Sequence, residues 1–432
     1  MNIHFIGIGG TAIGPLALIA HQMGHKVSGS DKQDSQYIEY LKKHGINDIY
    51  IGNDSTFLAE INTKNKIDQL VHSSAVSIEN PNHPEISFAK QNNILITKRD
   101  DLLNKILKDS GQKMIAIAGT HGKTTTTAMA VWLFKHLNIP ISYSVGAKIS
   151  FGDMGSYNPE SQHFVYECDE FDRNFLSFSP EISLITGVDY DHHDIYASRE
   201  EYVQAFQEFI DQSARNVVWQ SDIDKNNFQL DSNDLIINDN DEILNTLSII
   251  GKVNRRNAFQ VMECLKLIYP EESSKFKQIM EQFPGLSRRF EELATGLYSD
   301  YAHTPPKIAG CLQLAKEVGQ DNIVIVYEPL TNRRQYYIKD EYRQLFSGVK
   351  KLYWVPTYLA REDPNETVLS PSELIKYLDN KEVAEPAEFN ENLKINIKNH
   401  LKNGDLVVCI SGGGGGSLDE WLRQNIDYFK QD

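Results

Sequence analysis

Three features that the sequence lacks narrow the classes of protein it can encode. No apolar run approaches the roughly 18 residues that a membrane-spanning helix needs. The four cysteines stand far apart without paired spacing, so neither a zinc site nor a disulfide framework is indicated. The chain begins directly with strand-like residues rather than a basic segment followed by an apolar one, so we expect no export signal and a cytoplasmic location.

The chain is also short of positive charge. Its 43 Lys and Arg residues are outnumbered by 59 Asp and Glu residues, which gives a formal net charge of −16. This balance argues against nucleic acid or an anionic membrane surface as a partner. Any anionic substrate then has to be bound by local basic residues and helix N-termini. The length of 432 residues predicts about three domains.

Residues 115–127 carry the most informative pattern. An apolar run that ends at Ala118 leads into Gly-Thr-His-Gly-Lys-Thr, and a helix-compatible segment follows. This order predicts a strand, a tight turn and a helix N-terminus, where backbone amides converge on an anion. Lys123 is expected to reach the β- and γ-phosphates, and the Thr124 hydroxyl to bind Mg²⁺. The segment therefore predicts a site for ATP or GTP.

This turn is shorter than a standard phosphate-binding loop. The usual pattern has a glycine five places before the Gly-Lys pair, and Ile117 occupies that position here. The alternative interpretation is a fortuitous glycine turn with a surface lysine. The strand pattern before the turn and the helix pattern after it favour the phosphate loop.

Strand-like and helix-like segments alternate over the first hundred residues. Asn2–Ile8 is expected to be a strand that runs into the turn Gly7–Ala12, and Asp31 ends the next strand. This is a dinucleotide fingerprint, with an anion at a helix end and a carboxylate on a ribose, and it leaves open whether NAD or another nucleoside diphosphate is bound. Ser73 and Ser74 follow a later strand, at the edge where open α/β sheets bind ligands. Ordinary loop hydroxyls are the alternative for these two serines.

Acids and histidines end two successive strands of the middle segment. Glu167 closes the apolar run 164–167, and more acids follow up to Asp172. The strand expected at 180–186 leads to Asp189-Tyr190-Asp191-His192-His193-Asp194. Downstream of a phosphate loop, such groups are suitable Mg²⁺ ligands and substrate-positioning groups. A run of acids is usually a solvated face and a single histidine is often structural, but an acid that ends an apolar strand favours Glu167 as a ligand.

Paired arginines and a glycine run mark the rest of the chain. The pairs lie in Asn254-Arg255-Arg256-Asn257 and in Ser287-Arg288-Arg289-Phe290, where they are either phosphate contacts or ordinary surface arginines. Gly412–Gly416 separates a strand expected at 405–411 from a helix expected at 417–424. The run predicts a phosphate- or carboxylate-facing turn, a flexible lid, or a turn that needs several positive φ angles.

Over nearly the full length, the ordered series of blocks resembles the Mur ligase family. The first half of the series is the N-terminal glycine turn, Gly29-Ser30-Asp31, Ser73-Ser74-Ala75, Gly119–Thr124 and Tyr166-Glu167-Cys168-Asp169-Glu170. The second half is Asp191-His192-His193-Asp194-Ile195-Tyr196, Asn254-x-x-Asn257-Ala258, Arg288-Arg289-Phe290 and Asp300-Tyr301-Ala302-His303-x-Pro305. The ordered set is far more specific than any single block.

The resemblance implies a role for each block. The ATP would be held by Gly119, Thr120, His121, Gly122, Lys123, Thr124, Thr125, Asn257, Arg289 and Asp300. The Mg²⁺ ions would be surrounded by Thr124, Glu167 and His192, and the catalytic residues would be Lys123, Glu167, His192 and His303. The UDP-sugar and the amino acid would be bound by Gly9, Asp31, Ser73, Ser74, His193, Tyr301 and Arg334. In this family the first glycine turn receives a UDP-sugar rather than NAD.

The implied activity is that of an ATP-dependent ligase. It would join L-alanine to UDP-N-acetylmuramate through an acyl phosphate in peptidoglycan precursor synthesis, with His303 or His193 taking the proton of the amine. Residues 327–334, Tyr-Glu-Pro-Leu-Thr-Asn-Arg-Arg, lack the His-Arg pair usual in alanine-adding members, and Thr304 replaces a common second histidine. The Glu-Pro-x-x-Asn spelling is similar to that of ligases that attach a recycled stem tripeptide, which is one alternative. A nicotinamide-dependent dehydrogenase is another, but it leaves the phosphate loop unexplained.

These patterns together predict an α/β fold of three domains. We expect a Rossmann-like UDP-sugar-binding domain over residues 1–109 and a central P-loop ATPase domain over residues 110–290. A second Rossmann-like domain, which binds the amino acid, is expected over residues 291–432.

Overall fold

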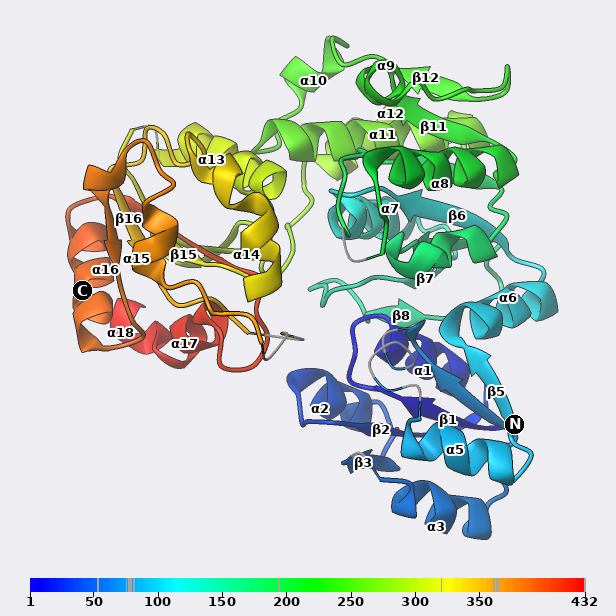
Figure 1. Cartoon of the computed structure of the whole chain (residues 1–432). Helices are drawn as coiled ribbons and strands as arrows, with labels where there is room; N and C mark the ends of the chain where they lie inside the picture. Colours follow the sequence, from blue (N-terminus) through cyan, green and yellow to red (C-terminus); the bar gives the residue numbers. More distant parts are fainter. Residues whose placement is uncertain are drawn as a thin grey trace. The chain divides into compact units, whose positions relative to one another are not determined.

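The computed structural model describes the chain except residues 53, 75, 77–79, 81, 193–194, 320, 360–361, 363–364 and 431–432. The chain forms two compact units. Unit 1 comprises Met1–Leu247 and Arg256–Phe283, and unit 2 comprises Ser248–Arg255 and Pro284–Asp432. Three mainly parallel sheets, two in unit 1 and one in unit 2, give the expected α/β fold (Figure 1). The domain borders at 109/110 and 290/291 remain predictions.

The first sheet of unit 1 is a five-stranded parallel sheet with the order β3-β2-β1-β4-β5. Its strands are β1 (Asn2–Ile6), β2 (Lys26–Asp31), β3 (Ile49–Ile51), β4 (Gln69–His72) and β5 (Leu95–Lys98). Its helices are α1 (Ile13–Gln22), α2 (Gln36–Lys43), α3 (Thr56–Lys64), α5 (Pro84–Gln91) and α6 (Arg99–Ser110). The strand order reverses between β1 and β4, and such a reversal opens a ligand crevice at the carboxyl ends of the two strands.

The second sheet of unit 1 has seven strands in the order β12-β11-β10-β6-β9-β7-β8. Its strands are β6 (Lys113–Ala118), β7 (Ser142–Ser144), β8 (Gly155–Ser156), β9 (His163–Glu167), β10 (Ile182–Ile185), β11 (Asn216–Trp219) and β12 (Leu235–Ile237). Its helices are α7 (Lys123–His136), η1 (Phe171–Ser177), α8 (Arg199–Gln212), α9 (Gln220–Asn226), α10 (Ile243–Thr246), α11 (Lys252–Ile268), η2 (Pro270–Glu272) and α12 (Ser273–Met280). The apolar residues of β6 are buried on both faces of the sheet, as a central parallel strand requires.

Unit 2 contains a six-stranded sheet with the order β13-β14-β18-β15-β16-β17. Its strands are β13 (Glu291–Ala294), β14 (Leu297–Asp300), β15 (Ile323–Glu328), β16 (Lys351–Trp354), β17 (Ala384–Pro386) and β18 (Leu406–Ser411). Its helices are α13 (Pro305–Gly319), α14 (Asn332–Ile338), η3 (Lys339–Tyr342), α15 (Pro371–Ile375), η4 (Lys381–Val383), α16 (Glu391–Lys402), α17 (Leu418–Gln424) and α18 (Ile426–Lys430). Strand β18 lies between β14 and β15, so loops distant in sequence meet at its carboxyl end.

The strands expected from the sequence are confirmed, with bounds that differ by one or two residues. The strand expected over Asn2–Ile8 ends at Ile6 because Gly7 adopts a φ of +73° and turns the chain. The amides of Gly7 and Ile8 then both donate to the carbonyl oxygen of Ser30. This turn ends the pairing of β1 with β2 before helix α1 begins.

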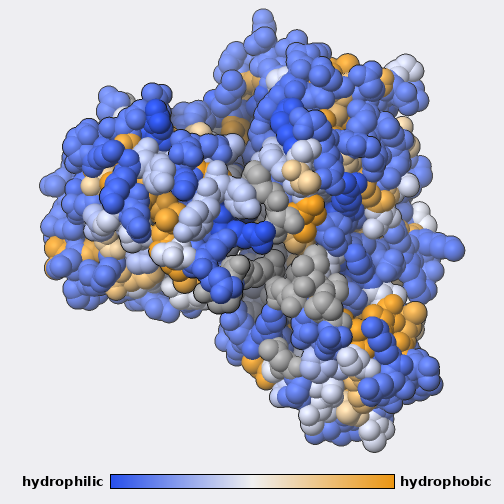
Figure 2. Space-filling view, viewed as in Figure 1, coloured by the Kyte–Doolittle hydropathy of each residue, from blue (hydrophilic) through white to orange (hydrophobic). Residues whose placement is uncertain are grey.

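The surface and the interior match the composition. Figure 2 shows a mostly hydrophilic face with apolar residues in small patches. None of the helices in the described part of the chain is both long and apolar enough to cross a bilayer. The four cysteines are buried free thiols.

Candidate active site

The phosphate loop lies between β6 and α7 in the middle of the second sheet. Gly119 adopts a φ of +144° and Gly122 a φ of +75°, values that disfavour other residues. A Cβ on Gly119 would also lie 2.4 Å from Thr186 Oγ1. Helix α7 begins at Lys123, so the amides of its first turn, which includes Thr124 and Thr125, lack helical partners and point towards an anion site.

Lys123 is held at the start of this helix by a buried carboxylate. Its Nζ donates to Glu170 Oε2 at 2.7 Å and to the carbonyl oxygen of Gly119 at 2.5 Å. Burial by itself would lower the pKa of Lys123, but Glu170 and other nearby carboxylates raise it above its ordinary value. Burial would likewise raise the pKa of Glu170, but Lys123 and His192 hold it at about 2. The pair is therefore charged at neutral pH.

Thr124 and Glu167 bring two oxygen groups together beside this lysine. The Thr124 hydroxyl donates to Glu167 Oε1 at 2.8 Å, and the amide of Gly146 donates to Glu167 Oε2 at 2.9 Å. A Cβ on Gly146 would lie 2.7 Å from Glu167 Oε2, so glycine is needed for this approach. A hydroxyl and a carboxylate in contact at a phosphate loop are the donor types that Mg²⁺ prefers.

Two other acids of the same strand end are paired with cations from the first sheet. Asp169 Oδ2 accepts from the Arg99 guanidinium at 2.9 Å, and Asp172 pairs with Lys98 at 3.2 Å. The Arg99 side chain is only 5% exposed. Lys98 and Arg99, where β5 meets α6, thus neutralise two acids that would otherwise repel a nucleotide.

His192 contacts Glu170, the carboxylate that also pairs with Lys123. Its Nε2 is 3.5 Å from Glu170 Oε1, and its backbone φ is +55°, an uncommon value for a residue with a side chain. Burial lowers the pKa of His192, but the contact with Glu170 outweighs this and raises it. A role for His192 as a metal ligand therefore remains a prediction, and His193 lies outside the described residues. Among the described residues, no three His, Cys, Asp or Glu side chains form a ready-made metal cluster.

The remaining predicted residues of the loop have their own fixed positions. Asn257 packs on Gly122, where a Cβ would lie 2.8 Å from Asn257 Oδ1. His121 forms an ion pair with Asp189, and the Thr120 hydroxyl donates to the carbonyl oxygen of Asp189 at 2.7 Å. The structure therefore brings these predicted loop residues and Asn257 together at the carboxyl end of β6.

The predicted UDP-sugar residues lie at the carboxyl edge of the first sheet. The Gly9 amide donates to Asp31 Oδ2 at 2.9 Å, and burial raises the pKa of Asp31. Ser73 follows β4, and the Ser74 hydroxyl donates to Asn174 Oδ1 at 2.8 Å. The turn after β1 and the end of β4 flank the strand-order reversal, where a nucleotide is expected.

In unit 2 the predicted residues gather after β14. Asp300 accepts from the amides of Phe290 and Ala302, each at 2.8 Å, and burial raises its pKa. The Arg288 and Arg289 guanidinium carbons lie 4.6 and 5.0 Å from the ring centre of Tyr301. Stacked arginines at this position form a planar cationic surface.

His303 and Arg334 complete the predicted set. His303 Nδ1 is 2.8 Å from the carbonyl oxygen of Tyr301, and because a carbonyl only accepts, Nδ1 carries the hydrogen and Nε2 has the lone pair. Lys307 Nζ lies 3.4 Å from that Nε2. Arg334 is half-buried on α14.

The glycine run after β18 is closely packed against other loops. A Cβ on Gly412 would lie 2.9 Å from Leu330, and one on Gly413 would lie 2.5 Å from the Tyr358 ring. Within the run, Gly416 alone has a positive φ, of +76°. The alternative that several positive φ values explain the run is therefore wrong, since the glycines at 412 and 413 are needed for close approach.

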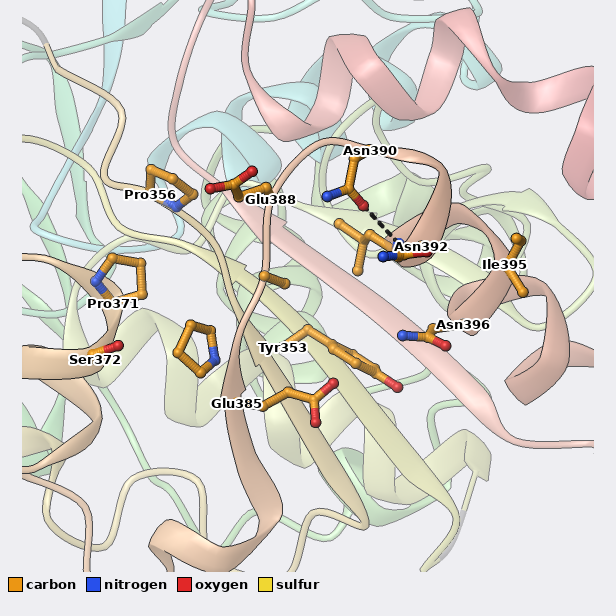
Figure 3. Close-up of a pocket in the computed structure, with 13 residues that line it drawn as sticks. Tyr353, Pro356, Pro371, Ser372, Glu385, Glu388, Asn390, Asn392, Ile395 and Asn396 are labelled. Carbon is orange, nitrogen blue, oxygen red and sulfur yellow. Dashed lines mark hydrogen bonds between the residues drawn. The ribbon is translucent and has the colours of Figure 1, made fainter.

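A cavity of about 660 Å³ lies in unit 2, at the carboxyl ends of β16 and β17 and the start of α16 (Figure 3). In Figure 3, Tyr353 and Glu385 project from the strands, and Asn390 accepts a hydrogen bond from a backbone amide of the helix start. None of the residues predicted for the reaction lines this cavity.

Sequence reasoning assigned no role to two residues of this site. Glu170 stood within the noted acid run, but the run does not say which acid the lysine contacts. Arg99 belonged to no motif, and its pairing with Asp169 bridges 70 positions of the chain. Buried charge partners of this kind follow from the tertiary fold.

Comparison with protein families places these features in context. The family model "Mur ligase family, catalytic domain" matches residues 2–110, and "Mur ligase middle domain" matches residues 117–236. The chain belongs to the Mur ligase family. As a member it is an ATP-dependent, amide-bond-forming ligase, in agreement with the phosphate loop.

Curated relatives match this Mur ligase over 95% of its chain. The UDP-N-acetylmuramate–L-alanine ligase of Clostridium acetobutylicum is 29% identical, and the alignment covers 95% of each chain. The enzyme of the same name from Caldicellulosiruptor bescii is 28% identical over the same shares.

Solved structures share the fold of this Mur ligase. The UDP-N-acetylmuramate–alanine ligase of Thermotoga maritima superimposes with a TM-score of 0.75 at 23% identity, covering 100% of this chain and 99% of that one. A murein peptide ligase from Psychrobacter arcticus gives a TM-score of 0.68 at 20% identity, with the same coverage. The shared fold therefore does not separate an alanine ligase from a peptide ligase.

Proposed function

We propose that this Mur ligase joins L-alanine to UDP-N-acetylmuramate in the cytoplasm, with conversion of ATP to ADP and phosphate. The observation that carries the proposal is the cluster of Lys123, Thr124 and Glu167 at the phosphate loop, in a chain whose full-length relatives are named for this reaction. In that reaction an oxygen of the lactyl carboxylate attacks the γ-phosphorus, and the bond to the β,γ-bridging oxygen breaks. ADP leaves with the electron pair, and an acyl phosphate remains.

The second step forms the amide. The neutral amine of the amino acid attacks the acyl carbon, a base takes its proton, and phosphate leaves as the carbon–oxygen bond breaks. Among the described residues, His303 is the candidate for this base: its Nδ1 donates to the Tyr301 carbonyl oxygen, and Lys307 Nζ lies 3.4 Å from its Nε2. The protein's main task is to position the reactants and balance their charge.

The residues at the loop fit a magnesium ion. The Thr124 hydroxyl and the Glu167 carboxylate lie 2.8 Å apart and supply adjacent oxygen donors of the kind that Mg²⁺ prefers. When bound, the ion would neutralise phosphate charge. Lys123 would contact the terminal phosphate, because it begins the helix whose free amides face the anion site.

The test is phosphate release with ATP, UDP-N-acetylmuramate and one acceptor at a time. The acceptors are L-alanine, L-serine, glycine and the stem tripeptide, and we expect the largest kcat/KM with L-alanine. A preference for the tripeptide would replace the alanine ligase by the peptide-attaching one. Lys123→Ala should reduce release by at least about a hundredfold, as the loss of one transition-state contact does. Near-wild-type release by this variant would disprove the role of the lysine.

A further inference from the structure

Glu170 pairs with the ammonium group of Lys123, the cation that is expected to bind the nucleotide phosphates. Lys123 Nζ is 2.7 Å from Glu170 Oε2, so an incoming phosphate meets a lysine that already has an anionic partner. The Glu170 side chain is 2% exposed and the Lys123 side chain 16% exposed. Charge-assisted bonds between partly desolvated groups are strong, so the phosphate and the carboxylate compete for one ammonium group.

The position of Glu170 is fixed from several sides. The Tyr196 hydroxyl donates to its carbonyl oxygen at 2.5 Å, and His192 lies 3.5 Å from its second carboxylate oxygen. Asp172 and Arg173, two and three residues after Glu170, both have left-handed backbone angles, with φ of +52° and +55°. Such strained residues persist where their surroundings hold them, and they cluster at functional sites.

We propose that Glu170 is an exchangeable counter-ion for Lys123, which weakens the grip of the loop on both ATP and ADP and so lets the product leave. This rests on the proposed function only in that nucleotide phosphates occupy the loop. Glu170 acts through Lys123 and is therefore a positioning residue. His192 contributes by aligning the Glu170 carboxylate, because it contacts the oxygen that Lys123 does not use.

The proposal predicts that a neutral side chain at position 170 tightens nucleotide binding. We expect Glu170→Gln to lower the dissociation constant of ADP, measured by titration calorimetry with Mg²⁺, by roughly tenfold. The dissociation constant of ATP should fall by a similar factor, and kcat should fall because ADP leaves more slowly. Glu160→Gln, at an exposed position of the same unit, is the matched control and should leave both constants unchanged. A merely structural role for Glu170 would weaken binding or leave it unchanged.

A double-mutant cycle with Lys123→Met isolates the pair. In the Lys123→Met background, which has no ammonium to release, adding Glu170→Gln should change the ADP dissociation constant far less than it does in the wild type. The double variant also leaves no buried charge unpaired, so it should fold. If Glu170→Gln alone does not fold, Glu170→Asp, which lengthens the contact, should show a smaller tightening.

The outcomes separate this inference from the proposed function. No tightening by Glu170→Gln or Glu170→Asp, or equal tightening with and without Lys123, would overturn the counter-ion role. A wild-type protein that binds neither ADP nor ATP would instead overturn the proposed function.

Discussion

Glu328, at the end of β15, makes the stability of unit 2 depend on pH. Its side chain is almost fully buried, and burial raises its pKa from 4.5 to about 7. The Ser411 hydroxyl and the Leu418 amide both donate to its Oε2 and oppose this rise, as does Arg288, whereas Asp419 adds to it. The folded protein therefore retains a proton that the unfolded chain has released between these two pH values.

The sign and size of the effect follow from this difference. Below pH 4.5 the carboxyl is protonated in both states and the raised pKa costs nothing. Between pH 4.5 and about 7 the unfolded state binds fewer protons, so the free energy of unfolding falls as the pH rises. Each pH unit is worth about 1.4 kcal/mol, so the loss reaches about 3 kcal/mol above pH 7.

Glu328→Gln should remove this loss and keep the contacts. Both hydrogen bonds to Glu328 end on one oxygen, so the amide oxygen of glutamine can accept them while its NH₂ group takes the other position. We expect the variant to gain about 2–3 kcal/mol relative to the wild type between pH 4.5 and pH 8. The measurement is urea unfolding followed by tryptophan fluorescence, with the buried Trp354 reporting on unit 2.

An exposed glutamate of the same unit gives the control. Glu382→Gln should shift the free energy of unfolding by less than about 0.5 kcal/mol at every pH. The reasoning about Glu328 is refuted if Glu328→Gln differs from the wild type by the same amount at pH 4.5 and pH 8. It is also refuted if the variant loses stability relative to the wild type as the pH rises.

Two further substitutions test packing and charge. Gly413→Ala places a Cβ 2.5 Å from the ring of Tyr358 and should lower the free energy of unfolding by about 1–3 kcal/mol. The control is Gly415→Ala, whose Cβ would have its nearest atom at 3.8 Å and which should leave thermal unfolding unchanged. Equal melting temperatures of the two variants would contradict the packing argument. Arg99→Met leaves two carboxylates without their buried cation and should lower the free energy of unfolding in urea by about 3 kcal/mol. Lys105→Met, which removes an exposed ion pair, should lower it by less than about 1 kcal/mol. An equal effect of both substitutions would show that burial does not matter.

Local patterns in the sequence predicted the elements of the site well. The phosphate loop was predictable because a buried strand, two glycines and a helix start are all encoded within residues 115–127. The position of Asp31 at a strand end was predictable for the same reason, whereas its contact with the Gly9 amide was not predicted and its role on a ribose stays a prediction. In each case the residues that form the feature lie close together in sequence or in a known βαβ order.

What the sequence could not provide were contacts between distant segments. Nothing near Lys123 shows that Glu170, rather than Glu167, is its partner, since Glu167 ends β9 and Glu170 follows it by only three residues. Which acid pairs with Lys123 depends on how the chain turns after β9, where Asp172 and Arg173 adopt left-handed backbone angles. The residue types at these two positions do not predict such angles. The glycine run is a similar case, because its close packing depends on Tyr358 from another loop.

The residues of the Glu-Pro-x-x-Asn pattern have structural contacts that do not depend on whether L-alanine or a peptide is the substrate. Asn332 is 1% exposed, and its side chain donates to the carbonyl oxygen of Thr367 at 3.1 Å and accepts from the amide of Leu369 at 2.9 Å. Its backbone amide donates to Glu362 at 2.9 Å. The asparagine thus ties the start of α14 to Glu362, Thr367 and Leu369, a task that is the same whichever acceptor is used. Glu328 likewise accepts hydrogen bonds from Ser411 and Leu418, so both the glutamate and the asparagine of this pattern hold loops together, and the pattern by itself is no evidence for a peptide acceptor.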